Sequence, residues 1–210
     1  RILKGQRSAG FQQLAQRAYV LDVPPGTLDL GDGRTLVHPA LQIRPDDRIA
    51  LVGANGLGKS TLLRHLLPQV LVPEERLLNI PQEISEDESR RIHEELKRLD
   101  DVPLGRVMTL VSRLGSRPAR LLASTTPSPG EIRKILLARG VARGPHLIVM
   151  DEPTNHLDLP SIECLEAALA EAPCALLLVS HDARFLSKLT RTRWELTPTT
   201  PTQIELNVVL

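Results

Sequence analysis

One stretch of the sequence decides the fold, and it reads Gly53-Ala54-Asn55-Gly56-Leu57-Gly58-Lys59-Ser60. It fits the pattern G-x-x-x-x-G-K-[ST]. The apolar run Ile49 to Val52 precedes it, and the run Thr61 to Leu67 follows with helical spacing. A glycine-rich turn between a strand and a helix lets the backbone wrap around an anion, and it directs N–H groups and the helix N-terminus toward that anion. The stretch therefore predicts a phosphate-binding loop.

Two side chains of this loop have expected roles of their own. Lys59 is expected to reach the outer phosphates, and Ser60 is expected to place its hydroxyl on Mg²⁺. The alternative, a glycine turn with an incidental lysine, leaves the flanking strand and helix unexplained. The expected nucleotide-binding residues of the loop are Gly53, Ala54, Asn55, Gly56, Leu57, Gly58, Lys59, Ser60 and Thr61.

Three apolar runs predict the sheet that carries the loop. Arg48 to Val52, Leu147 to Met150 and Ala175 to Val179 do not alternate between apolar and polar residues. Such runs are typical of parallel strands that are covered by helices on both faces. Ligands gather at the carboxyl ends of such strands in open α/β sheets.

The remaining segments predict a β region, a helical region and a terminal hairpin. Turn residues and alternation between Thr27 and Ile43 indicate an antiparallel edge sheet. Ser85 can cap a helix that opens a largely helical stretch as far as residue 122, which Pro103 and residues 115–118 interrupt. Further helices are expected at about 129–142 and 160–170, each with proline near its first turn. Residues 193–196 and 203–209 suggest the hairpin.

A pair of acids ends the second apolar run. Burying Asp151 and Glu152 at a strand end is costly unless they meet a cation or a polar network. Asp151 is expected to hold Mg²⁺, and Glu152 to orient or polarise an attacking water. The alternative is a simple helix-capping pair, which the phosphate loop disfavours.

The residues that follow carry a family resemblance. The stretch 151–158 reads Asp-Glu-Pro-Thr-Asn-His-Leu-Asp. It resembles the ATP-binding-cassette (ABC) ATPases, and most of all the ABC-F branch, over about Leu28 to Leu196. The resemblance implies an α/β fold with a P-loop NTPase core and a mostly parallel sheet, an N-terminal antiparallel β subdomain and an inserted helical subdomain. It also implies ATP and Mg²⁺ as ligands.

Several residues match family motifs position by position. Gln82 resembles the Q-loop glutamine that senses Mg²⁺ and the γ-phosphate, and His181 matches the switch histidine. Asp158 matches the D-loop acid that crosses to a partner cassette, although it can also cap the helix near Pro160. With Lys59 and Glu152, these residues complete the expected catalytic set Lys59, Gln82, Glu152 and His181. The expected metal ligands are Ser60, Gln82 and Asp151.

Two positions depart from the family pattern. The signature, usually Leu-Ser-Gly-Gly-Gln or Leu-Ser-Gly-Gly-Glu, is Pro-Ser-Pro-Gly-Glu at residues 127–131. Ser128, Gly130 and Glu131 are expected to face a partner's nucleotide, or merely to cap a helix. In that helix Ser128 is the expected N-cap, and Pro129, which lacks an N–H, is the expected first residue.

The second departure concerns the adenine. Around Leu30, where many relatives stack adenine on an aromatic ring, Leu30 or Val37 offers an apolar face instead, so weak base discrimination is expected.

Composition excludes several classes of protein. Lys plus Arg number 26 and Asp plus Glu number 25, a formal net charge of +1 that excludes nucleic-acid binding by bulk charge alone. Two cysteines fit a reducing cytosol. No apolar run approaches the roughly 20 residues that span a bilayer. We expect a cytoplasmic protein without direct membrane insertion.

These observations predict the domain plan and the function. The plan has a basic linker stub at 1–20, an ATP-binding core at 21–84 and 124–196, an inserted helical subdomain at 85–123 and a C-terminal tail at 197–210. The resemblance implies Mg²⁺-dependent ATP hydrolysis by a cassette that closes on a second one, in the same polypeptide or in a homodimer, and acts on ribosomes. The alternatives are an ATPase subunit of a membrane transporter and a non-hydrolysing regulatory cassette.

Overall fold

The computed structural model describes residues 18–124, 127–155 and 157–210. The basic linker stub expected at residues 1–20 lies almost wholly outside them. Eight strands form one large sheet in the order β2-β3-β10-β9-β5-β8-β7-β6. Their bounds are β2 Gly26–Asp29, β3 Thr35–His38, β10 Gln203–Val209, β9 Thr192–Thr200, β5 Arg48–Val52, β8 Ala175–Val179, β7 Leu147–Asp151 and β6 Leu77–Ile80.

The three apolar runs form adjacent parallel strands of this sheet, as predicted. β5 pairs with β8 and β8 with β7, all parallel, and the flanking strands β9 and β6 also pair in parallel. Every residue of β7 and β8 is buried. Since neither strand reaches the surface, neither needs a polar face, and alternation is absent from both.

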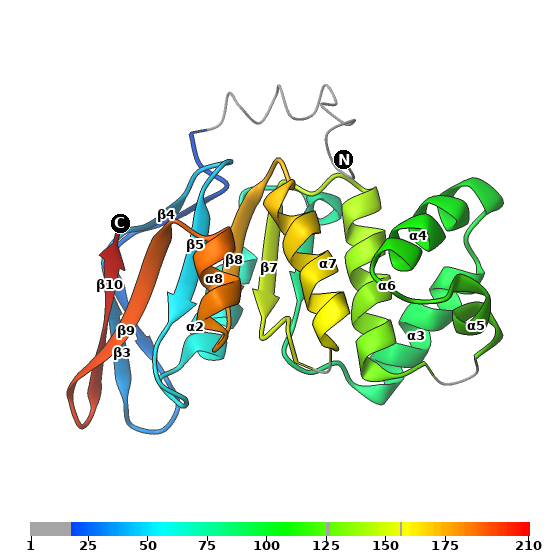
Figure 1. Ribbon diagram of the computed structural model, residues 1–210. Coiled ribbons are helices and arrows are strands. Elements are labelled where there is room, and N and C mark those ends of the chain that lie inside the picture. The colour runs from blue at the N-terminus through cyan, green and yellow to red at the C-terminus, as the bar shows by residue number, and fades with distance from the viewer. Residues whose placement is uncertain (1–17, 125–126, 156) are drawn as a thin grey trace.

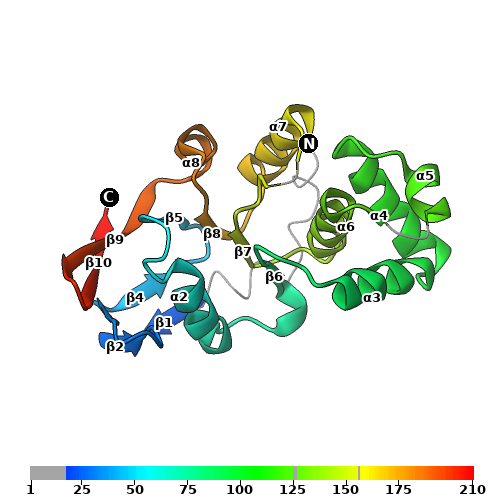
Figure 2. The same ribbon diagram turned by 90° about the horizontal axis from the view of Figure 1, so that it is seen from below.

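Helices cover both faces of the sheet (Figure 2). Leu147 and Val149 pack in the same apolar cluster as α2 (Lys59–Leu66). Ile148 and Met150 pack in a second cluster with α7 (Leu159–Ala170) and α8 (Ala183–Leu189). Neighbouring residues of one strand thus serve opposite faces, because side chains alternate across a strand.

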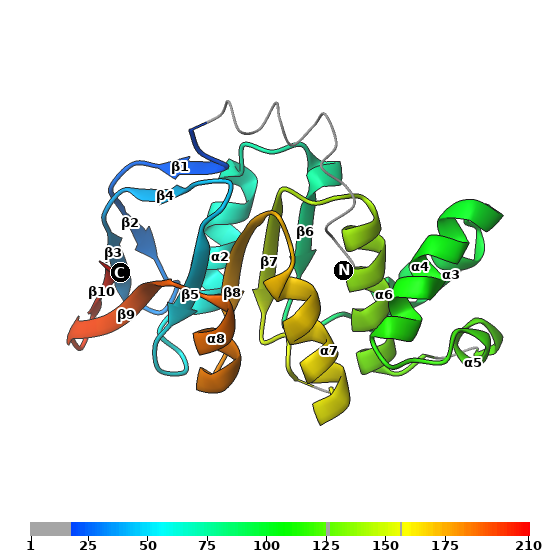
Figure 3. The same ribbon diagram turned by 45° about the horizontal axis from the view of Figure 1, so that its top comes forward.

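The N-terminal β region is antiparallel, as predicted, but only its strands β2 and β3 join the large sheet. β2 pairs antiparallel with β3, and β1 (Leu21–Val23) pairs antiparallel with β4 (Leu41–Ile43) in a separate two-stranded sheet (Figure 3). β3 also pairs in parallel with β10. β9 and β10 form the predicted terminal hairpin. The hairpin therefore connects the N-terminal β region to the parallel centre.

Helices α3 to α5 gather at the opposite end of the molecule from β9 and β10 (Figure 1). They are α3 Glu86–Lys97, α4 Asp101–Arg113 and α5 Pro118–Ala123, and they share an apolar cluster with α6 Pro129–Ala142. Ser85 caps α3 as predicted, since its hydroxyl accepts the amide of Glu88. Pro103 lies inside the first turn of α4, where a missing N–H is tolerated, so the break falls just before Asp101.

Short 3₁₀ helices complete the described structure: η1 is Leu67–Gln69 and η2 is Glu74–Arg76. In residues 18–124, 127–155 and 157–210, no helix combines the length and the apolar character that a membrane crossing requires.

Candidate functional site

The glycine-rich loop connects β5 to α2 with backbone angles that require glycine. Gly58 caps α2 with a φ of 92°, in the left-handed region. A Cβ atom there would lie 2.7 Å from Cδ2 of Leu30, so a side chain at this position would collide as well as strain the backbone. The close approach brings Leu30 of the neighbouring β2–β3 turn against the loop.

Lys59 and Ser60 begin α2 and point to different parts of the site. The Lys59 ammonium donates to the carbonyl of Gly53 at 2.7 Å and to that of Ala54 at 3.0 Å. Burial lowers the pKa of Lys59, while the charges of Glu152 and Asp151 act in the opposite direction. The Ser60 hydroxyl donates to Oδ2 of Asp151 at 2.6 Å. This bond joins the loop to the strand that ends in acids.

Asp151 and Glu152 are both buried at the carboxyl end of β7. Glu152 has a φ of 50°, a conformation that non-glycine residues adopt rarely and that clusters at functional sites. Its Oε2 accepts the backbone N–H of His181 at 3.3 Å. Its Oε1 has no hydrogen-bond partner and lies 3.4 Å from Nε2 of His181. The site thus holds a buried carboxylate oxygen that is free to accept a bond.

A cavity of about 700 Å³ brings most of the predicted residues together. Those that line it are Leu30, Asn55, Gly56, Gly58, Lys59, Ser60, Thr61, Gln82, Asp151, Glu152 and His181. Asp32, Arg34, Thr154, Asn155 and Asp182 line it as well and were not predicted. Predicted residues that do not line it are Gly53, Ala54, Leu57, Val37, Ser128, Gly130, Glu131 and Asp158.

The signature segment forms the start of α6. The Ser128 hydroxyl accepts a hydrogen bond from the backbone N–H of Glu131, and the Glu131 carboxylate accepts one from the backbone N–H of Ser128. Pro129 is the first helical residue. This is the predicted capped helix, and the proline leaves the helix intact. Asp158 caps α7 by accepting the amide of Ser161 at 3.2 Å.

Arg133 on α6 contacts the candidate site, and the sequence did not predict it. It is buried, with 5% of its surface exposed, and it donates to the carbonyls of Gln82 and Glu152. Burial lowers the pKa of its guanidinium, and the charges of Asp151 and Glu152 oppose the shift. No local pattern marks it, because its neighbours in α6 are largely apolar and its partners lie 19 and 51 residues away.

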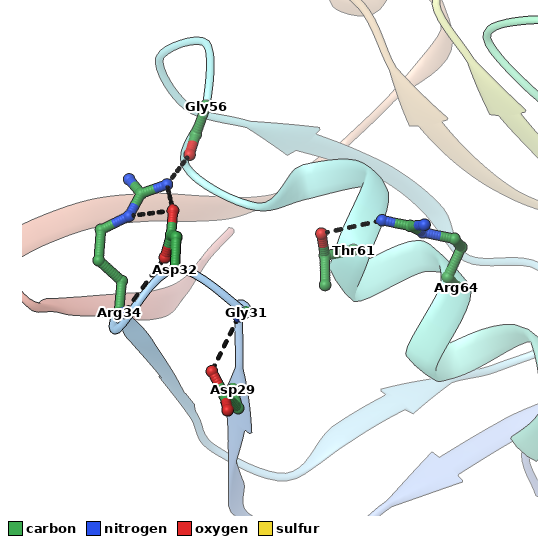
Figure 4. A network of polar contacts seen from close by, with 7 residues as sticks. All are labelled: Asp29, Gly31, Asp32, Arg34, Gly56, Thr61 and Arg64. Atoms are coloured by element: carbon green, nitrogen blue, oxygen red, sulfur yellow. Dashed lines mark hydrogen bonds and ion pairs between the residues drawn. The ribbon is translucent and has the colours of Figure 1, made fainter.

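A second network lies on the β2–β3 turn (Figure 4). The Arg34 guanidinium donates through Nε to Oδ2 of Asp32 at 2.9 Å and through Nη2 to the carbonyl of Gly56 at 2.8 Å. The hydrogen bond to Arg34 lowers the pKa of Asp32. The contact to Gly56 connects the turn to the tip of the phosphate loop.

The donors of the site suit Mg²⁺. Within the described ranges, no group of three or more His, Cys, Asp or Glu residues could hold a metal ion unaided. Mg²⁺ does not need such a group, because it keeps several waters and binds one or two protein oxygens together with substrate phosphates. The adjacent Ser60 hydroxyl and Asp151 carboxylate supply that minimal set.

Comparisons with known proteins support the resemblance. The model of the family "ABC transporter" matches residues 36–103. A zinc import ATP-binding protein, ZnuC of Paracoccus denitrificans, is 34% identical over 168 residues, which cover 72% of this chain and 65% of that protein. The ribosome protection protein VmlR of Bacillus subtilis is 33% identical over 185 residues, covering 82% of this chain and 33% of that protein. The chain thus spans between one third and two thirds of these relatives.

Solved structures share the fold. The RNase-L inhibitor superposes with a TM-score of 0.71 at 20% identity, covering 92% of this chain and 40% of that one. A metal-chelate type ABC transporter in an inward-facing conformation superposes with a TM-score of 0.66 at 19% identity. The match covers 90% of this chain and 83% of that one. At such identities the likeness concerns the fold alone.

Proposed function

Because the chain belongs to the ATP-binding-cassette family, we propose that it binds ATP together with Mg²⁺ and hydrolyses the bond to the terminal phosphate. The observation that carries the proposal is the 2.6 Å bond between Ser60 and Asp151. It joins a phosphate-binding loop to a buried acid pair, and this combination suits phosphoryl transfer, in which positioning and charge stabilisation supply almost all of the catalysis.

Each residue has a task in this proposal. The loop N–H groups and Lys59 bind the phosphates, and Ser60 and Asp151 hold Mg²⁺, which neutralises charge on the transferred group. The unbonded Oε1 of Glu152 accepts a hydrogen bond from the attacking water and orients it. His181 and Gln82 line the same cavity. In the proposal they would contact the terminal phosphate and the metal.

Replacing Glu152 by glutamine tests the hydrolytic step. Glu152→Gln keeps the shape of the side chain but removes the basic oxygen, so we expect turnover of ATP to fall by about 10²- to 10⁴-fold while ATP still binds. Glu195→Gln, an exposed position on β9, is the matched control. Turnover at the wild-type rate in Glu152→Gln would show that Glu152 is not the base. A wild-type chain that binds ATP without turnover would favour the non-hydrolysing cassette.

We further propose that two cassettes close around two nucleotides. Ser128, Gly130 and Glu131 do not line the cavity of their own chain, and they lie at the N-terminus of α6, the positive end of its helix dipole. In the proposal this helix end faces the nucleotide of a second cassette, and Asp158 contacts that cassette. ATP then joins the two halves, and hydrolysis separates them.

The proposed partner is the ribosome, and the proposed location is the cytoplasm. The match to a ribosome protection protein supports this reading, as does the sequence at 151–158. The match to a zinc import ATP-binding protein favours the second candidate, an ATPase that serves a membrane transporter. The two readings differ in the partner that the ATP-bound state holds.

Co-sedimentation with ribosomes distinguishes the ribosomal proposal from the membrane-transporter candidate. Glu152→Gln loaded with ATP is expected to sediment with ribosomes, and the same protein without nucleotide is expected to stay in the supernatant. Equal sedimentation with and without ATP would contradict the ribosomal proposal. ATP-dependent capture by membrane vesicles that carry the transporter subunits would support the second candidate.

A further inference from the structure

The reactive end of the cavity determines where a nucleoside must lie. Glu152 and His181 are in contact within the cavity, and the terminal phosphate must reach them for hydrolysis. The β2–β3 turn lines the same cavity through Leu30, Asp32 and Arg34, and Arg34 contacts the phosphate loop at Gly56. A nucleotide whose phosphates follow the loop therefore extends its base toward this turn.

Among the described residues, no phenylalanine, tyrosine or tryptophan lines the cavity to stack on the base. Phe185 and Trp194 are fully buried in the core, and Tyr19 lies outside the cavity lining. Leu30 packs against Gly58 and offers an apolar edge only. At this wall the guanidinium of Arg34 provides a planar cation.

That guanidinium is held in place before any ligand binds. Asp32 accepts bonds from its Nε and Nη2, and the Gly56 carbonyl accepts a further bond from Nη2 (Figure 4). Hydrogen bonds of a guanidinium lie in its plane, so these contacts occupy its edge and leave its faces unbonded. Its side chain is 31% exposed. An immobilised planar cation costs less entropy to use on binding than a free arginine would.

We propose that Arg34 is the base-recognition residue of this site: its guanidinium plane stacks on the purine, and Asp32 positions it. The inference rests on the proposed nucleotide-binding function. Arginine planes stack on nucleobases through cation–π attraction and surface contact, with little preference among bases. The wall is therefore expected to distinguish adenine from guanine weakly.

ADP, GDP and inorganic pyrophosphate, each with Mg²⁺, test this assignment by calorimetric titration, because the proposed hydrolysis acts on none of them. In Arg34→Ala, ADP is expected to bind about 5- to 30-fold more weakly, while pyrophosphate changes less than about 2-fold. Arg34→Tyr restores a stacking plane without the bond to Gly56, so ADP affinity returns to within about 3-fold of wild type. Arg34→Lys keeps the charge without the planar group, so its affinity for ADP is expected to stay as low as that of Arg34→Ala. GDP is expected to follow ADP in every variant.

Arg44 provides the control position for these titrations. Arg44→Ala removes an exposed arginine outside the cavity and is expected to change neither affinity. Equal weakening of ADP and pyrophosphate would overturn the proposal, because Arg34 would then support the loop or the phosphates. Rescue by lysine but not by tyrosine would overturn it as well. If the wild-type chain bound neither ligand, the proposed nucleotide function would itself fall, whereas unchanged ADP binding in Arg34→Ala would refute this inference alone.

Discussion

Arg133 joins three parts of the site, and its replacement should separate activity from stability. Arg133→Met keeps the length of the side chain and removes the two bonds to Gln82 and Glu152. In this variant the Glu152 carbonyl still accepts a hydrogen bond from the backbone N–H of Asn155 at 3.2 Å. Gln82 is exposed, so water can replace the guanidinium at the Gln82 carbonyl. Removal of a buried cation also recovers desolvation energy.

The lost hydrogen bonds, partly offset by the recovered desolvation energy, give a modest loss of stability. The loss of turnover is expected to be larger. We expect the free energy of unfolding to fall by about 1 kcal/mol, which lowers Tm by about 2–4 °C in a chain of this size. Turnover of ATP should fall by about 10- to 100-fold, because Gln82 and Glu152 are no longer held to one another and to the helix.

Thermal unfolding and steady-state ATP turnover measure the two effects, with Arg139→Met as the matched control. Arg139 lies on the same helix and pairs with Glu95 at 2.7 Å, away from the cavity. Its loss should cost no more than about 1 kcal/mol and leave turnover unchanged. If Arg133→Met turned over ATP as fast as Arg139→Met, the positioning role of Arg133 would be refuted.

Two further predictions concern stability. A Cβ at Gly140 would lie 2.4 Å from Cδ1 of Leu78, so Gly140→Ala should lower the free energy of unfolding by about 1–2 kcal/mol. Gly105 has open space around it, so Gly105→Ala should raise the free energy of unfolding by about 1 kcal/mol. Urea unfolding that finds both variants stabilised would contradict this prediction. Burial, and then the Arg76 charge, lower the pKa of His146 below 6.5. Between its folded-state pKa and 6.5 the unfolded chain binds a proton there that the folded chain does not, so stability falls as pH decreases through this window. The difference in urea midpoint between about pH 7.5 and about pH 5.5 should be smaller in His146→Gln; an equal difference would exclude this contribution.

Much of the fold was predictable because its signals are local. The parallel strands, the terminal hairpin, the helix at Pro129–Ala142 and its Ser128 cap all follow from residues within a few positions of one another. The N-terminal β region was predicted as antiparallel, but its parallel pairing with β10 was not, because the partners Leu36 and Ile204 are far apart in sequence. Strand order between distant segments depends on packing.

The sequence by itself determined which groups this protein can bring to phosphate chemistry: a glycine-rich loop with Lys59 and Ser60, and a strand that ends in Asp151 and Glu152. Only the tertiary structure decided that these groups meet, that the buried Arg133 bonds to the carbonyls of Gln82 and Glu152, and that Arg34 reaches the loop. The reason is physical. Backbone turns, caps and strand periodicity arise from neighbouring residues, whereas a bond across 22 or 91 residues exists only when the packed core places both partners within reach.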